Sequence, residues 1–112
     1  MSARLDAAVA SELSTDQLDR LRRLLVEEHA AHQARALDLV DSVDLEPDLV
    51  DVLLARCHEG TEEIDIALAR MGAGTYGSCL ACGIAIPYER LEFLPAADRC
   101  VACQADRNRF SR

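Results

Sequence analysis

With 112 residues, the chain is long enough for one small domain and too short for two ordinary ones. Its formal net charge is −8, and because so acidic a surface is repelled by phosphate backbones, general nucleic-acid binding is disfavoured. The chain has no Trp, two Phe and two Tyr, so its apolar residues are mostly aliphatic and favour helices packed along stripes over a broad aromatic core.

The N-terminal stretch MSARLDAAVASEL does not read as a secretory signal, because acidic residues interrupt it. We expect residues 1–13 to form an N-terminal segment with room for one short helix. The apolar runs of the chain are too short to cross a bilayer. We therefore predict a cytoplasmic protein with no membrane partner, in a compartment that keeps thiols reduced.

A long helix is expected from Ser14 to about Ser42. The sequence STDQ is a capping box, in which the side chains of Ser14 and Gln17 each accept a hydrogen bond from the other residue's backbone. Beyond it, residues suited to one helix face recur at spacings of three and four. They are Leu18, Leu21, Leu25, His29, His32, Ala36, Leu39 and Val43. This pattern predicts a stripe that packs on a second helix.

That second helix is expected from Pro47 to about Met71, because proline suits a first helical turn and Gly72 can end the helix. Its stripe holds Val50, Leu53, Cys57, Thr61, Ile64, Leu68 and Met71. Two helices of similar length joined by a few residues pack antiparallel. Residues 14–73 therefore predict a coiled-coil hairpin.

The middle of both stripes is polar, since His29, His32, Cys57 and Thr61 stand where leucine is expected. One interpretation is a second metal or a pH-sensitive layer that also involves His58. The other, which we favour, is a weak coiled-coil layer with hydrogen-bonded histidines. Cys57 is then a small buried hydrophobe.

The turn of the hairpin is acidic. Its acids are Asp38, Asp41, Asp44, Glu46, Asp48 and Asp51, with no base among them. Acids at the start of a helix suit its dipole and can be merely solvated, but Asp38 and Asp41 lie near a helix end that disfavours negative charge. A tip near residues 41–48 with this charge suits a basic or metal-containing cavity of a partner. The spacing lacks the central glycine of an EF-hand.

Two C-x-x-C pairs follow, Cys79 with Cys82 and Cys100 with Cys103, separated by residues 83–99. This spacing is typical of a structural, tetrahedral zinc site, and four thiolates leave no open position for catalysis. We therefore expect one structural Zn²⁺ and no enzyme. Two disulfides or a redox C-x-x-C are the alternatives, but a redox motif calls for a βαβ pattern that the sequence lacks.

Residues 74–112 are thus expected to form a zinc finger and a C-terminal helix. Apolar residues between the cysteine pairs should build a small core over the metal: Ile84, Ile86, Leu91, Phe93 and Leu94. Such a small core cannot stand alone, so loss of zinc should unfold this end. The expected fold is mostly α, an antiparallel coiled-coil hairpin on a zinc-finger base with a short C-terminal helix.

Residues 74–104, GTYGSCLACGIAIPYERLEFLPAADRCVACQ, resemble the zinc-finger signature of the DksA/TraR family of bacterial transcription factors. The preceding hairpin is similar to the DksA architecture, a coiled-coil hairpin on a globular base. The resemblance implies a regulator that binds RNA polymerase, inserts its hairpin into the secondary channel and alters initiation. It also implies no sequence-specific DNA binding, and we expect a monomer.

The family's tip motif, D-x-x-D-x-A, is matched at residues 41–46 and implies a partner-binding role for Asp41 and Asp44. Glu46 departs from the motif's alanine, which puts the usual regulatory effect in question. The resemblance also places the guanosine tetraphosphate positions of DksA on Glu63, Leu94 and Gln104. None is basic, so we expect no nucleotide site of the DksA type.

Two other functions compete with this hypothesis. A zinc-stabilised hairpin adaptor without transcriptional activity would bind another protein through apolar anchors on the outer rod, for which Leu24, Val26, Leu37 and Val40 are candidates. Direct DNA binding would depend on the arginine cluster in residues 106–112, which more often is a solvated helix end.

Overall fold

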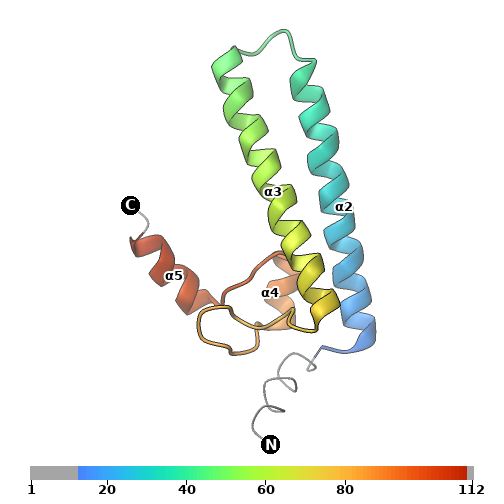
Figure 1. Cartoon of the computed structure of the whole chain (residues 1–112), viewed down its shortest axis with the longest axis vertical. Coiled ribbons are helices and arrows are strands. Elements are labelled where there is room, and N and C mark those ends of the chain that lie inside the picture. The colour runs from blue at the N-terminus through green and yellow to red at the C-terminus, as the bar shows by residue number, and fades with distance from the viewer. Residues whose placement is uncertain (1–12, 111–112) are drawn as a thin grey trace, which may run out of the picture.

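The computed structural model describes residues 13–110. Within them lie the helices α2 (Thr15–Val40), α3 (Pro47–Ala73), α4 (Tyr88–Phe93) and α5 (Val101–Phe110), with one isolated β-bridge between Ser78 and Ala85. Helices α2 and α3 form an antiparallel hairpin that stands on a base built from the rest of the chain (Figure 1). This confirms the mostly α fold. The expected N-terminal segment lies outside the described residues, except for Leu13.

Among these helices, none has both the length and the apolar character needed to cross a bilayer.

Helix α2 begins as its capping box predicts. The Gln17 N–H donates to Ser14 Oγ at 3.0 Å, and the Ser14 N–H donates to Gln17 Oε1 at 2.9 Å. The helix ends at Val40, slightly earlier than expected, with Asp41 as its C-cap. At about 1.5 Å per residue, it is roughly 40 Å long.

Helix α3 begins at Pro47 as expected, but it runs past the predicted end. Gly74, and not Gly72, is its C-cap, with φ 80° and ψ 17°. The Gly74 N–H donates to the carbonyl oxygens of Arg70 and Met71, which have no partner further along the helix. That left-handed conformation suits glycine, whereas Gly72 is an ordinary helical residue.

The core lies where the hairpin meets the finger. It contains Leu21, Leu25, Ile64, Ala67, Tyr76, Cys79, Ile86, Leu91 and Cys100. Leu21, Leu25, Ile64 and Leu91 are at most 1% exposed. The finger therefore shares one core with both long helices and builds no core of its own.

The expected small core over the metal is wrong in part. Ile86 and Leu91 are buried, but Ile84, Phe93 and Leu94 are 54%, 82% and 46% exposed. Helix α4 has only six residues, and Leu91 is the one that it buries in the shared core. Phe93, two positions beyond Leu91, lies on another face of α4, and Leu94 is the C-cap residue, where the chain leaves the helix.

Both predicted stripes are buried or half-buried along the hairpin, apart from Val43. Val43 is 92% exposed, because α2 has ended and the chain turns away from α3. The stripe pattern thus identified the packed faces wherever the chain is helical.

The polar middle of the hairpin contains His29, whose Nε2 lies 3.3 Å from Asp65 Oδ1 on α3. The His32 ring lies against the backbone of Gly60, where a Cβ atom would come within 2.6 Å of Nε2. Cys57 is buried, as predicted. In residues 13–110, the four finger cysteines are the one group of three or more donors placed to hold a metal, so nothing supports a second metal here.

The contact between His32 and Gly60 predicts unequal effects of alanine at two glycines of α3. Gly72→Ala should stabilise the protein by up to about 1 kcal/mol, because alanine favours helix and no atom lies within 4 Å. Gly60→Ala should forfeit that gain, because His32 must move, and overpacking typically costs about 1–3 kcal/mol. Urea unfolding followed by circular dichroism checks both variants. Equal stabilisation by the two substitutions would show that His32 is not held in place.

Candidate metal centre and hairpin tip

The first cysteine pair lies on a tight turn. The Cys79 N–H donates to the Ile84 carbonyl at 2.8 Å, and the Gly83 N–H donates to the Cys79 carbonyl at 2.9 Å. Gly77 and Gly83 have φ values of 94° and 83°, a region that side chains with a Cβ rarely adopt. These glycines let the chain reverse so that Cys79 and Cys82 point the same way.

The second cysteine pair is positioned by the start of α5. The Gln104 N–H donates to the Cys100 carbonyl at 2.9 Å, which brings Cys103 one turn beyond Cys100. The Leu80 N–H donates to the Asp98 carbonyl at 2.8 Å and ties the two halves of the finger together. The two pairs therefore face each other.

The ligand atoms of the four cysteines all lie within 4.8 Å of one another, and Cys82 Sγ is 3.8 Å from Cys100 Sγ. A disulfide needs about 2.05 Å, so the cysteines are free thiols and not two disulfides. Zn–S bonds of about 2.3 Å in a tetrahedron separate the sulfur atoms by about 3.8 Å. The observed sulfur cluster fits one tetrahedral zinc ion.

The sulfur atoms also perturb one another. Burial by itself raises the pKa of the Cys79 thiol, but hydrogen bonds from nearby backbone N–H groups, that of Cys100 first, outweigh burial and lower the pKa to about 6. Neighbouring sulfur atoms, that of Cys100 first, raise the pKa of Cys103. Four thiolates so close together repel each other, and a divalent cation at their centre removes that repulsion.

Side-chain hydrogen bonds join the finger to the hairpin and also connect parts of the finger. Arg70 Nη2, near the end of α3, donates to the carbonyl oxygens of Thr75 and Ser78, both at 2.7 Å. Tyr76 Oη donates to the Pro95 carbonyl at 2.8 Å, and burial raises the pKa of this phenol. The sequence offered no direct signal for these contacts, because their acceptors are backbone carbonyls.

A salt bridge adds to this junction. Arg20 Nε on α2 lies 2.9 Å from Glu92 Oε2 on α4. Both side chains are partly exposed, so the pair adds little stability, although it links α4 to α2.

The predicted tip residues Asp41, Asp44 and Glu46 lie in the loop between α2 and α3, at the far end of the hairpin from the finger (Figure 1). Asp41 caps α2, whose last turn contains no basic residue, and Glu46 caps α3 without a side-chain hydrogen bond. All six acids between Asp38 and Asp51 are exposed. Within the described part of the chain, no hydrogen bond or ion pair engages their carboxylates.

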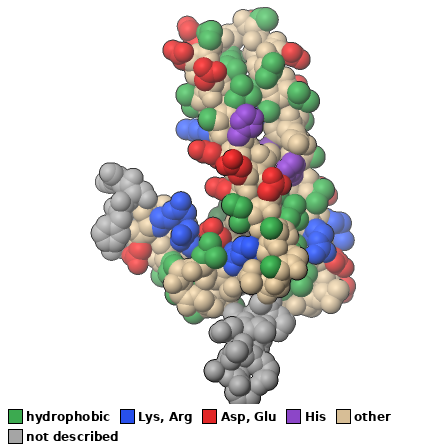
Figure 2. All heavy atoms as spheres, in the orientation of Figure 1, with side chains coloured by type: hydrophobic (Ala, Val, Ile, Leu, Met, Phe, Trp, Pro, Cys, Tyr) green, Lys and Arg blue, Asp and Glu red, His purple; other side chains and the backbone are tan. Residues whose placement is uncertain are grey.

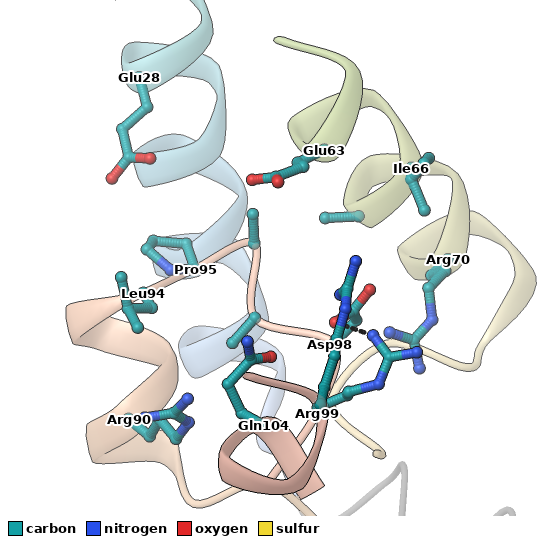
Figure 3. A pocket seen from close by; sticks show the side chains of 14 residues that line it. Glu28, Glu63, Ile66, Arg70, Arg90, Leu94, Pro95, Asp98, Arg99 and Gln104 are labelled. Carbon is teal, nitrogen blue, oxygen red and sulfur yellow. Dashed lines mark hydrogen bonds and ion pairs between the residues drawn. The ribbon is translucent and has the colours of Figure 1, made fainter. Parts of the chain in front are cut away.

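A cleft of about 380 Å³ lies between the hairpin and the base. Glu63, Leu94 and Gln104, which the sequence analysis grouped together, do line the same cleft (Figure 3). Four arginines line the cleft too, and the sequence gives no sign of their grouping because they come from separate elements: Arg70, Arg90, Arg99 and Arg107.

The charges in this cleft are mixed. Glu28, Glu63 and Asp98 face the same space as the arginines, and Arg99 Nη1 lies 3.5 Å from Asp98 Oδ1. Arg70 is already bonded to backbone carbonyls. Arg90 Nε is buried and has no hydrogen-bond partner.

Known proteins match both the zinc finger and the fold of most of the chain. Residues 74–109 match the prokaryotic dksA/traR C4-type zinc finger. Transcription factor DksA2 from Pseudomonas aeruginosa superposes with a TM-score of 0.69 at 29% identity, over 89% of each chain. The protein has a DksA/TraR-type zinc finger and a DksA-like fold.

Two further relatives define the extent of the match. The DnaK suppressor protein from Agrobacterium tumefaciens C58 has the same fold, with a TM-score of 0.63 at 24% identity over 80% of this chain and 92% of that one. General stress protein 16O of Bacillus subtilis (strain 168) is 53% identical over 45 residues, 40% of this chain. That match spans 28% of the relative's length.

The C4-type finger and the cysteine cluster together establish one structural zinc ion in this DksA-like protein. Zinc would be held by the four thiolates, leaving no open coordination position. Two of the four cysteines, Cys79 and Cys100, belong to the shared core, so the metal site and the base of the hairpin are one unit.

Single substitutions distinguish the four cysteines of the cluster, which are the expected zinc ligands, from Cys57, which lies outside it. Cys100→Ser should abolish zinc binding and unfold the base, because a structural zinc site and its fold form together. Cys57→Ala should keep one zinc ion per chain, because Cys57 lies on α3 apart from the cluster. Native mass spectrometry gives the zinc count and NMR dispersion reports the fold. One zinc ion in Cys100→Ser, or none in Cys57→Ala, would refute the ligand set.

Proposed function

We propose that this DksA-like protein is a cytoplasmic, monomeric transcription regulator that binds bacterial RNA polymerase and inserts its hairpin tip into the secondary channel. The observation that carries the proposal is the hairpin itself. It places exposed, unpaired carboxylates about 40 Å from the base, on a rod only two helices wide. Its structural relative DksA2 is described as a transcription factor.

The tip has a charge that folding does not require. Asp38 and Asp41 lie at the C-terminal end of α2, where the helix dipole disfavours them, and no base of that turn compensates. A binding role for these acids accounts for a charge that the helix itself disfavours. We assign the partner contact to Asp41 and Asp44, at the tip of a hairpin unit spanning residues 14–73, with residues 74–112 as its base.

Glu46 adds a further charge to the tip. Its carboxylate is exposed and makes no capping hydrogen bond to α3. Where the family motif has alanine, a longer acidic side chain projects from the loop. We propose that the protein still binds the channel and that Glu46 changes the effect on initiation.

The adaptor hypothesis has weaker support. Of its four candidate anchors, Leu24 is half-buried and packs on the core, whereas Val26, Leu37 and Val40 are 52%, 69% and 65% exposed. Val26 lies far along α2 from the other two. The exposed anchors therefore do not form one patch along the rod, as an adaptor surface requires.

The tip assignment is tested with two double variants that remove equal charge. Asp41→Asn/Asp44→Asn should lose most of the effect on open-complex lifetime, yet bind core polymerase within about fivefold of wild type, because each of the two exposed charges contributes roughly 0.5 kcal/mol. Glu59→Gln/Glu62→Gln, on exposed positions of α3, should behave as wild type.

Binding is measured in competition with a factor that occupies the secondary channel. Wild-type protein should be displaced. If the competitor has no effect on binding, the channel is the wrong site, and the adaptor hypothesis becomes the stronger one.

We also propose that the cleft is not a DksA-type guanosine tetraphosphate site. Glu63 repels phosphate there, and Leu94 and Gln104 provide no charge. Titrating the nucleotide into the protein–polymerase complex should give no saturable binding at concentrations that saturate a DksA complex. Saturable binding that Arg90→Gln abolishes would contradict the proposal. It would show that the cleft arginines take the place of the basic side chains absent at Glu63, Leu94 and Gln104.

A further inference from the structure

The outer half of the hairpin exposes aliphatic side chains as well as acids. Between residues 37 and 52, five large hydrophobic residues are exposed by 44% to 92%: Leu37, Val40, Val43, Leu49 and Val52. In the rest of the two helices, residues 15–36 and 53–73, only Val26 and Ile66 are exposed in this way. Within the hairpin, the exposed aliphatic surface is therefore concentrated near the tip, where Figure 2 shows hydrophobic and acidic side chains together.

These five residues do not hold the hairpin together. The contact between α2 and α3 near the tip is made by the stripe residues Leu39, Val50 and Leu53, which are buried or half-buried. Exposed aliphatic residues scattered singly need no explanation, but a cluster marks an interaction site.

The five residues lie on both helices and in the loop between them. Leu37 and Val40 are neighbours on α2, and Leu49 and Val52 are neighbours on α3, because positions three apart share a helix face. Val43 stands in the loop between Asp41 and Asp44. Leu37 and Val40 also line the groove between the two helices, together with Leu54. Apolar and acidic side chains thus alternate over one end of the rod.

We infer that residues 37–52 are an amphipathic docking surface, whose partner is a protein cleft with an apolar floor and a basic rim. The aliphatic side chains enter the floor and supply affinity, while the carboxylates face the rim and orient the hairpin. The inference depends on the proposed function, since the cleft is taken to be the wall of the polymerase channel.

Charge selects this occupant over two others. Nucleic acid is disfavoured because its phosphates meet six acids and no base. A second copy of the chain is disfavoured because two identical tips repel, and each chain carries a net charge of −8. A basic protein cleft is complementary to the acids and can bury the aliphatic residues between them.

The test uses Val40→Ser/Val43→Ser, which removes exposed aliphatic groups without changing charge. Val26→Ser/Ile66→Ser is the matched control, because both residues are exposed and lie outside the docking surface. Kd for core polymerase is measured over a series of salt concentrations. We expect Val40→Ser/Val43→Ser to weaken binding about tenfold or more, because the buried apolar area is lost. Its salt dependence should match that of wild type, since no charge has changed.

The Asp41→Asn/Asp44→Asn variant should show the opposite pattern, with a shallower salt dependence and a smaller loss of affinity. The midpoints of thermal unfolding should stay close to wild type in all variants, because none of the exchanged side chains is buried.

Wild-type affinity in Val40→Ser/Val43→Ser would overturn the docking surface while leaving the proposed function intact. Equal weakening by the control pair would also overturn it, because apolar contact would then not be confined to the tip. Absence of binding by wild type itself would refute the proposed function, and with it the partner assigned to the docking surface.

Discussion

The shared core at the junction of hairpin and finger is the constraint on which the rest of the structure depends. A chain of 112 residues with no Trp has little to bury, and it concentrates its fully buried side chains at one place. Leu21 and Leu25 from α2 meet Ile64 from α3 and Leu91 from the finger there. The zinc site adjoins this core, because Cys79 and Cys100 belong both to the core and to the metal cluster.

With stability concentrated at the base, the outer hairpin is free to serve another purpose. Its middle is polar, with His32 against Gly60 and His29 beside Asp65. Its end has unpaired acids and exposed aliphatic residues, and none of these residues belongs to the core. A stable base and an exposed tip suit a hairpin that places a few side chains deep inside a partner protein.

Local chemistry made much of this predictable from the sequence. Ser14, Pro47 and the C-x-x-C pairs signal a helix start, a second helix start and a zinc site through neighbours a few residues away. Gly72 and Gly74 were indistinguishable by that reasoning, because either can end a helix. The exposure of Phe93 and the arginines around the cleft could not be predicted, because they depend on how α4 and α5 lie against the hairpin. The charge pattern at residues 41–46 showed the tip but not the aliphatic surface around it.

The most direct test of the central claim is site-specific photo-crosslinking to core RNA polymerase. A benzophenone amino acid at position 43 replaces a side chain that is 92% exposed and leaves every tip carboxylate in place. The same amino acid at Ala69, exposed on α3 near the base, is the reference position. We predict that crosslinks from position 43 map to residues lining the secondary channel and that those from position 69 do not. Crosslinks from position 43 to the outer surface of the polymerase, or none under conditions where the complex forms, would contradict the account.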